Sequence, residues 1–284
     1  MKIKGICFEG GGICGIAYIG ALYELQSHDM LKDITHFIGS SIGSIFALLL
    51  SCKIDISEIY KLFINLDLTK FEDSSYFILK DIYRFNTQFG WNSGNNFDAL
   101  LSDILNKYVG TNILTFEEIN KRFGNTLIIT ATDMKKRKTV YFSPLSTPNM
   151  DVKLAIRCSI SLPLFYSPVY LNDTFYIDGG FLDNYPIKEL YKYVKKEEVI
   201  GLKLVNNKNE CEHEHELPRN IIEYIKLLIL MMRDNQLKIN NDEIDRTIFI
   251  DVGNVSAIDF NITVDKKEEL MLQGKLAVLQ FLNK

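Results

Sequence analysis

The sequence lacks the features that mark several large protein classes. Its most apolar run, Leu227 to Met232, is six residues long between Lys226 and Arg233, which is too short to cross a bilayer. The five cysteines lie far apart and include no C-x-x-C pair, so neither a disulfide framework nor a zinc knuckle is indicated. The formal net charge is only -4, which provides no global field for a phosphate backbone, and we expect no nucleic-acid partner.

Targeting signals are also missing from the first residues. Met1 to Glu9 runs straight into glycines, without the long apolar stretch and small-residue cleavage site of a signal peptide. Scattered cysteines fit a reducing compartment. We therefore expect a cytoplasmic protein.

What the chain does contain is the composition of an ordinary globular protein. With 284 residues, 47% hydrophobic and 24% charged, it can build one sizeable core. We expect a single domain over residues 1–284.

Two strand-loop-helix units open the sequence. Ile3 to Phe8 is a β-rich run, and after a glycine loop apolar residues recur at helical spacing from Ile16 to Gln26. His36 to Ile38 then leads through a second glycine-serine turn into the apolar helix Ile45 to Leu50. Consecutive βα units predict an α/β fold in which helices cover a parallel sheet.

The remaining chain divides into a core, an insertion and a C-terminal part. We assign residues 1–52 and 97–205 to the core, and about 53–96 to an aromatic cap without clear periodicity. Residues 218–284 are predicted to pack on the core as a helix from Asn220 to about Asn240, a strand at Thr247 to Val252 and a helix from Lys266. Within the core the patterns predict a hairpin, a helix and two strands, at Leu127 to Phe142, Val152 to Ser161, Thr174 to Ile177 and Val199 to Val205.

The first loop, Gly10-Gly11-Gly12-Ile13-Cys14-Gly15, follows a strand and opens a helix. Its backbone amides can converge on an anion at the positive end of the helix dipole. Two chemistries use such a loop, because Gly10, Gly12 and Gly15 also spell G-x-G-x-x-G. The anion is either a dinucleotide pyrophosphate or the oxyanion of an acyl-transfer intermediate.

The second unit favours acyl transfer. A dinucleotide site needs an acidic residue after the second strand, but this strand ends in Gly39-Ser40-Ser41-Ile42-Gly43. In a strand-turn-helix context G-x-S-x-G predicts a nucleophile elbow that exposes the hydroxyl of Ser41. The amide of Ile42 and those of the glycine loop can then serve one oxyanion.

A serine nucleophile needs a base, and the chain has only four histidines: His28, His36, His213 and His215. His28 lies in a polar loop, and His36 is predicted to be a structural residue of a strand. Asp178 stands at the end of a strand before Gly179 and Gly180. Asp-Gly-Gly is compatible with a plain tight turn as well as with a catalytic carboxylate.

Three motifs in order resemble the patatin-like phospholipase family: the glycine loop from Gly10, the elbow at Ser41, and Asp178-Gly179-Gly180 followed by Asp183-Asn184-Tyr185-Pro186. The segment Ala155 to Pro163 is also similar to the family's sequence before the aspartate strand. The resemblance covers roughly Lys4 to Val205. It implies a three-layer α/β/α fold with a mainly parallel central sheet.

The resemblance also implies roles for individual residues. Ser41 would be the nucleophile and Asp178 its partner in a dyad without histidine, with Gly10 to Gly12 in the oxyanion hole. Gly15, Gly39, Gly43, Gly179 and Gly180 support these motifs. The implied substrates are phospholipids or other acyl lipids, and we expect the protein to meet them as a peripheral protein at a membrane surface. We expect the chemistry to need no cofactor or metal. Whether a protein activator takes part stays open. Where the family usually has Lys or Arg, this chain has Cys14, a change that leaves the backbone donors in place.

An aspartate of ordinary pKa, about 3.9, is a feeble base toward serine. Burial beside a lipid would raise the pKa of Asp178 and strengthen the base. We therefore expect activity to fall in acid and to be flat above neutrality.

Two other functions stay open at this stage. Ser41, Asp178 and His213 or His215 occur in the chain order of an α/β-hydrolase triad, although both histidines lie in a polar stretch. A non-catalytic lipid-binding module with a hydrolase fold is the alternative outside enzymes.

Two further features bear on membrane contact. The basic cluster Lys135 to Lys138 reads as a solvated turn or as a contact to anionic lipid. The aromatic residues of the cap are equally compatible with the lipid-facing entrance of a binding site and with ordinary core packing.

Overall fold

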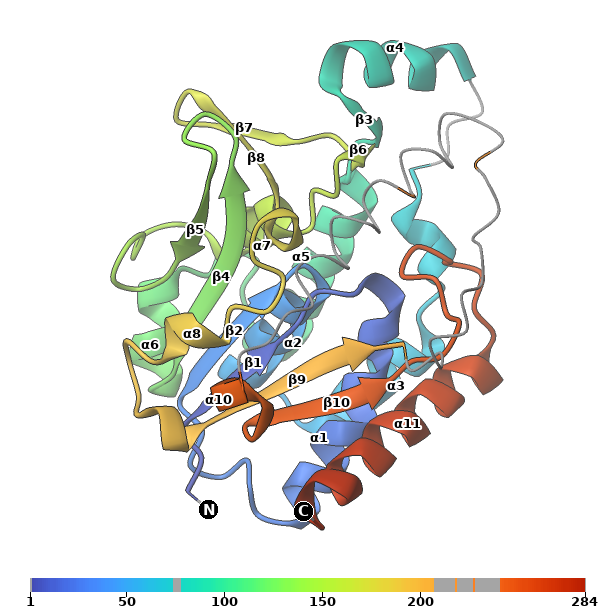
Figure 1. The fold of residues 1–284 in the computed structure, drawn as a ribbon. Coiled ribbons are helices and arrows are strands. Elements are labelled where there is room, and N and C mark those ends of the chain that lie inside the picture. Colours follow the sequence, from blue (N-terminus) through green and yellow to red (C-terminus); the bar gives the residue numbers. More distant parts are fainter. Residues whose placement is uncertain (1, 74–77, 207–217, 219–226, 228–240, 284) are drawn as a thin grey trace.

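The computed structural model describes residues 2–73, 78–206, 218, 227 and 241–283 (Figure 1). Within these residues, no helix combines the length and the hydrophobicity that crossing a bilayer requires. The expected helix at 220–240 lies outside the described residues, apart from one position.

A central sheet organises the described chain, with strands in the order β10-β9-β1-β2-β4-β8-β7 and β5 paired to β4. Its parallel strands are β1 (Gly5–Phe8), β2 (His36–Ser40), β4 (Thr126–Asp133), β9 (Val199–Val205) and β10 (Thr247–Asp251). The antiparallel strands are β5 (Lys138–Phe142), β7 (Val169–Leu171) and β8 (Thr174–Asp178). The predicted mainly parallel sheet and the predicted hairpin are both confirmed.

Helices cover both faces of this sheet, but unequally. Ile6 and Phe8 of β1 belong to the large core on one face, beneath α1 (Ala17–Ser27) and α2 (Ile42–Ser51). Cys7, which points the other way, belongs to a smaller cluster beneath the short helix α8 (Ile187–Leu190). The expected three-layer arrangement is therefore present with one thick and one thin helical layer.

The C-terminal helix α11 (Val264–Leu282) lies along α1, on the thick side (Figure 1). Glycines make the close approach possible: a Cβ on Gly20 would lie 1.7 Å from the carbonyl oxygen of Met271, and one on Gly274 would lie 1.9 Å from that of Ala17. The sequence predicted this helix from Lys266. It begins two residues earlier because the Thr263 hydroxyl accepts a hydrogen bond from the Lys266 amide (3.3 Å).

Several elements between the first units and the hairpin have no counterpart in the sequence prediction. They are α3 (Ile56–Asn65), η2 (Leu68–Phe71), α4 (Ile78–Gln88), β3 (Gly90–Asn92), α5 (Asn95–Val109) and α6 (Phe116–Phe123). β3 pairs in parallel with β6 (Leu164–Tyr166) as a separate small sheet. α3 buries Ile56, Ile59 and Phe63, and the Phe63 ring stacks on Phe46 with ring centroids 5.0 Å apart. The first helix of the segment predicted as a cap thus packs into the core.

The remaining helical pieces are short: η1 (Gly12–Ile16), α7 (Val152–Ser159), η3 (Gly179–Phe181), η4 (Lys196–Glu198) and α10 (Asn241–Ile244). η1 contains the second part of the glycine loop, and η3 directly follows Asp178. They therefore position the residues of the candidate site.

Candidate active site

Ser41 sits in a strained backbone conformation between β2 and α2. Its φ of 50° and ψ of -126° are rare for a residue with a side chain, and they mark a sharp strand-to-helix turn. The flanking glycines are required by space: a Cβ on Gly39 would lie 2.2 Å from the backbone of Gly43, and one on Gly43 would lie 2.4 Å from the carbonyl oxygen of Phe8. The turn therefore has the geometry of a nucleophile elbow.

Two serines hold this turn. The Ser41 amide donates to Oγ of Ser159 on α7 (2.9 Å), and the Ser44 hydroxyl donates to the carbonyl oxygen of Ser41 (2.6 Å). The backbone of Ser41 is thus fixed at both of its polar groups, while its own hydroxyl stays available for other contacts.

Asp178 reaches the elbow because β8 runs antiparallel to its neighbour. On β4, Thr130 pairs with Ser40 on one side, and the next residue, Ala131, pairs with Asp178 on the other. The end of β8 is thereby brought level with the end of β2. The two candidate residues are 137 positions apart in sequence, and only this register brings them together.

The Asp178 carboxylate is nearly inaccessible, with 5% of the residue exposed. Burial raises its pKa to about 6, while hydrogen bonds from the Ser41 hydroxyl and the Gly180 amide act in the opposite direction. The Gly180 amide lies 2.7 Å from Oδ1 of Asp178. Near neutral pH this carboxylate is ionised, and it is more basic than an exposed one.

The glycine loop lies beside the elbow, and several of its amides already have partners, among them that of Cys14, which donates to the carbonyl oxygen of Gly11 (3.2 Å). The Gly10 amide donates to the carbonyl oxygen of Asn184 (3.1 Å), and the Ile13 amide donates to that of Ala257 (3.0 Å). Within the part of the chain that the structure describes, the amides of Gly11, Gly12 and Ile42 donate no hydrogen bond. These three N–H groups are therefore not committed to another acceptor in the described chain.

Glycine 15 and glycine 179 bring the surrounding segments close. A Cβ on Gly15 would lie 2.7 Å from the Ile42 side chain, so its absence lets η1 approach the start of α2. A Cβ on Gly179 would lie 2.4 Å from the carbonyl oxygen of Thr130. Both glycines therefore contribute to the site through packing.

A buried ion pair holds the start of the glycine loop in place. Nζ of Lys203 on β9 lies 2.5 Å from Oε1 of Glu9, and both side chains are almost completely inaccessible. The other carboxylate oxygen of Glu9 accepts from the Leu204 amide (2.7 Å). Since Glu9 directly precedes Gly10, this pair fixes the start of the loop, and removal of either charge would leave the other unpaired in the core.

Asn184, Ser159 and Lys203 are site residues that the sequence analysis did not assign. Nδ2 of Asn184 donates to the carbonyl oxygen of Gly10 (2.9 Å), so this side chain ties the segment after Asp178 to the glycine loop. Asn184 and Ser159 lie within the two quoted motif segments, which was the available signal. Nothing local in the strand Val199 to Val205 distinguishes Lys203.

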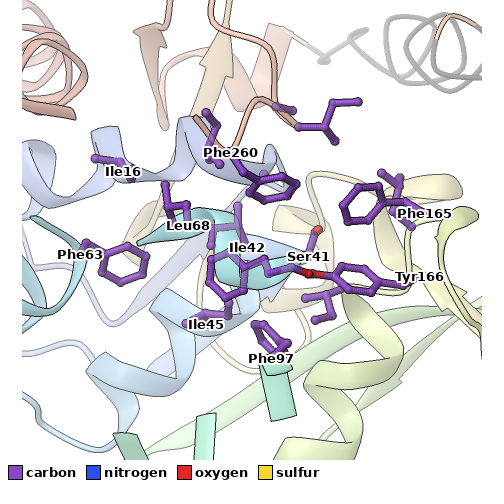
Figure 2. A pocket seen from close by; sticks show the side chains of 17 residues that line it. Ile16, Ser41, Ile42, Ile45, Phe63, Leu68, Phe97, Phe165, Tyr166 and Phe260 are labelled. Atoms are coloured by element: carbon purple, nitrogen blue, oxygen red, sulfur yellow. The ribbon is translucent and has the colours of Figure 1, made fainter. Parts of the chain in front are cut away.

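A pocket opens at Ser41 (Figure 2). Its walls are almost entirely apolar and come from the glycine loop, α2, α3, α5, the β6 segment and the loop before α11. The lining side chains include Ile42, Ile45, Phe63, Phe97, Phe165 and Phe260. Part of the aromatic segment therefore lines the pocket, through Phe63, Leu68 and Phe71.

Cys14 and the described histidines are not among the residues that line this pocket. The Cys14 thiol is buried and donates to the carbonyl oxygen of Val255 (3.4 Å). His28 is paired with Glu24, and His36 begins β2, whereas Ser41 follows the end of that strand. His213 and His215 lie outside the described residues. In the described ranges there is no group of three or more His, Cys, Asp or Glu side chains suited to a metal.

Comparison with known proteins gives consistent matches. The family model described as patatin-like phospholipase matches residues 6–191. The chain is 31% identical to the uncharacterized protein R571 of Acanthamoeba polyphaga mimivirus, covering 98% of this chain and 93% of the relative. It is also 31% identical to the probable lipid hydrolase 463L of Invertebrate iridescent virus 6, covering 68% of this chain and 65% of that protein.

Among solved structures, VipD from Legionella pneumophila is similar with a TM-score of 0.69 and 20% sequence identity. The match covers 100% of this chain and 67% of VipD. At this identity the likeness concerns the fold.

The raised pKa of Asp178 has a consequence for stability. Because the folded state disfavours the ionised carboxylate, Asp178 lowers the free energy of unfolding above pH 6, and this cost shrinks as the pH falls from 6 towards 4. The isosteric variant Asp178→Asn should therefore be more stable than the wild type at pH 8, by about 2–3 kcal/mol for a pKa shift of about two units.

Urea denaturation of both proteins at pH 8 and pH 5 measures this difference. A variant that is less stable at pH 8, or whose gain does not shrink at pH 5, would show that burial of the carboxylate is not the dominant cause.

Proposed function

The chain belongs to the patatin-like phospholipase family of lipid acyl hydrolases, and we propose that it cleaves acyl esters of phospholipids with Ser41 as nucleophile and Asp178 as base. The observation that carries this proposal is the contact of the Ser41 hydroxyl with the buried Asp178 carboxylate. Ser41 also lines a pocket whose walls are almost entirely apolar.

In the proposed first step, Asp178 accepts the proton of the Ser41 hydroxyl while Oγ attacks the ester carbonyl carbon. The tetrahedral oxyanion is held by the amides of Gly11, Gly12 and Ile42, the donors without a partner in the described structure. Gly10 keeps its role in shaping the loop, since its amide is already bonded to Asn184. The intermediate collapses when the ester C–O bond breaks, and the leaving alcohol takes the proton from Asp178.

The second step returns the enzyme to its starting state. Asp178 removes a proton from a water molecule, whose oxygen attacks the acyl carbon of the Ser41 ester. When the bond to Oγ breaks, Ser41 regains its proton from Asp178 and the fatty acid leaves. Each step needs the carboxylate ionised at its start, which a pKa of about 6 permits at neutral pH.

The pocket supports a lipid rather than a small polar ester as substrate. Burying a hydrocarbon chain against walls such as Ile45, Phe63 and Phe97 contributes about 0.8 kcal/mol for each CH₂ group. The long acyl chain of a phospholipid can use this contribution. The remaining elements of the proposal are peripheral contact with a membrane, a cytoplasmic location, and chemistry that requires no metal or cofactor.

The two alternatives receive less support. A triad needs a histidine beside Asp178, and of the four histidines His28 and His36 are held elsewhere in the fold. A pure binding module has no need of the strained Ser41 backbone, because a lipid pocket functions without an exposed hydroxyl.

The proposal is tested by fatty acid release from mixed phospholipid vesicles. Wild type should release fatty acid, and Ser41→Ala and Asp178→Asn should lose at least roughly a thousandfold in rate, because each removes a group that takes part in every step. The double variant His213→Ala/His215→Ala is the matched control and should retain full activity. Wild-type activity in either dyad variant, or its loss in the histidine variant, would contradict the dyad.

Asn184 should act on the rate through the glycine loop. Asn184→Asp keeps the side-chain size but removes the donor to the Gly10 carbonyl oxygen. We expect kcat to fall roughly tenfold to a hundredfold, the equivalent of one lost buried hydrogen bond, with KM changed less than threefold. Kinetics on a soluble ester and the rate of fluorophosphonate labelling at Ser41 measure this. Unchanged labelling would mean that Asn184 does not position the oxyanion donors.

A further inference from the structure

The outer face of α4 and β3 exposes four large apolar side chains beside the polar residues Asn86, Thr87 and Gln88. Tyr83 and Ile82 of α4 are 68% and 44% exposed, and Phe89 and Trp91 beyond its end are 53% and 39% exposed. A surface helix ordinarily turns its charged side chains outward. Here Arg84 is turned inward instead, in an ion pair with Asp81 (2.6 Å) whose two side chains are almost buried.

Phe89 adds backbone strain to this exposure. Its φ of 59° lies in the left-handed region, which bulky residues rarely adopt and which Gly and Asn tolerate. The ring makes an edge contact with Phe175 of β8, with centroids 5.9 Å apart, yet more than half of the residue remains exposed. A strained, exposed phenylalanine suggests a use outside the core.

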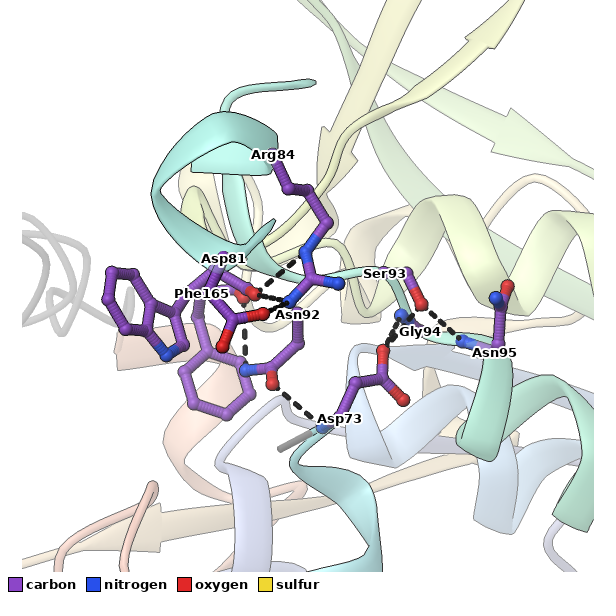
Figure 3. Close-up of polar contacts among 9 residues, drawn as sticks. Asp73, Asp81, Arg84, Asn92, Ser93, Gly94, Asn95 and Phe165 are labelled. Carbon is purple, nitrogen blue, oxygen red and sulfur yellow. Dashed lines mark hydrogen bonds and ion pairs between the residues drawn. The ribbon is translucent and has the colours of Figure 1, made fainter. Parts of the chain in front are cut away.

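A polar network fixes this face to the wall of the pocket (Figure 3). Nε of Arg84 donates to the carbonyl oxygen of Trp91 (2.9 Å), and Nδ2 of Asn92 donates to that of Phe165 (3.2 Å). Asp73 accepts from the Gly94 amide (2.6 Å), so Asp73 is joined to the residues that follow β3. Because Phe165 lines the pocket at Ser41, the exposed side chains of α4 and β3 have a fixed position relative to the proposed site of cleavage.

Two hairpins extend the same end of the molecule (Figure 1). The Met134 amide donates to the carbonyl oxygen of Phe175 (3.0 Å), so the β4–β5 turn lies against β8. This turn exposes the basic residues Lys135–Lys138, and the neighbouring hairpin exposes Tyr170 (64%). Two carboxylates are near: Asp133, 3.6 Å from Nζ of Lys136, and the exposed Asp173. Four cations against two anions leave a local positive charge in a chain of net charge -4.

We propose that these elements form one docking surface for an anionic phospholipid bilayer. The α4–hairpin surface, as we call it, consists of Lys135–Lys138 and the exposed side chains of Ile82, Tyr83, Phe89, Trp91, Met134 and Tyr170. Trp and Tyr side chains favour the interface between water and lipid, and clustered basic residues favour anionic headgroups. The inference rests on the proposed function in that the bilayer is also the source of substrate.

The single tryptophan of the chain, Trp91, lies in this surface and reports on it directly. The test uses the Ser41→Ala protein, so that binding is read without hydrolysis, and vesicles of phosphatidylcholine alone or with phosphatidylserine at three to one. Anionic vesicles should shift the Trp91 emission to the blue, and brominated acyl chains should quench it. Phosphatidylcholine alone should give a much weaker response.

Two variants in the Ser41→Ala background divide the surface into its parts. Neutralising the cluster with Lys135→Gln, Lys136→Gln, Arg137→Gln and Lys138→Gln should weaken vesicle binding by roughly a hundredfold. Tyr83→Gln combined with Phe89→Asn should weaken it roughly tenfold, and asparagine suits the left-handed backbone at position 89, so this variant should fold.

Matched controls remove equivalent groups elsewhere. Ile113→Gln with Leu145→Gln removes two side chains that are 63% and 79% exposed, and Leu145 follows β5 at the end of that hairpin remote from the basic turn. The charge control replaces four exposed lysines outside the surface by glutamine: Lys32, Lys121, Lys192 and Lys195. Neither control should change vesicle binding more than about twofold, since both leave the docking surface intact.

Each outcome separates docking from catalysis. The surface variants with Ser41 restored should hydrolyse a soluble ester at the wild-type rate. If the wild type lacks that hydrolysis while Trp91 still enters anionic vesicles, the proposed function fails and the docking surface stands. Trp91 emission that ignores anionic vesicles, or controls that weaken binding as much as the surface variants, would overturn the proposal. A concentration-dependent change in Trp91 emission without vesicles would identify a second copy of the chain as the occupant instead.

Discussion

The contact between the Ser41 hydroxyl and the desolvated Asp178 carboxylate is the interaction on which the rest of the site depends. An exposed aspartate is too weak a base to activate a serine, and burial is the physical means that raises its pKa to about 6. Burial of a charge destabilises the fold unless donors meet it, and here the Gly180 amide does so at 2.7 Å. The proposed catalytic strength of Asp178 and its cost to stability therefore have the same origin.

The topology of the sheet brings Ser41 and Asp178 together. The glycine loop follows β1, and Ser41 follows β2, so parallel strands deliver both to the same edge. Asp178 arrives from the opposite direction on antiparallel β8, which ends level with the elbow. Asn184 and the Glu9–Lys203 pair then tie the glycine loop to the segments that surround it. Three chain segments, distant in sequence, thus meet around one reacting carbon in the proposed mechanism.

Local patterns in the sequence predicted the elements in which a short stretch determines its own geometry. The two βα units, the β4–β5 hairpin and the parallel sheet are of this kind, and Ser41 was singled out because a glycine-flanked turn needs only its neighbours. Lys203 could not be assigned, because its partner Glu9 lies 194 positions away and a lysine in an apolar strand has no local signature. The helix α3 was missed for a different reason: its buried residues Ile56, Ile59 and Phe63 recur at helical spacing, but the many aromatic residues around it hid this period. In α4, Ile82 and Tyr83 are exposed, so its apolar residues do not mark a buried face.

The pH dependence of kcat/KM on a soluble ester tests the central claim most directly, because it reads the ionisation of the base in the free enzyme. A buried aspartate as the only titrating group predicts a single acid limb with an apparent pKa near 6 and a plateau above it. The profile should be unchanged when His213 and His215 are both replaced by alanine. An acid limb near pH 4 would contradict the raised pKa of Asp178, and a limb that disappears with the histidines would assign the base to one of them.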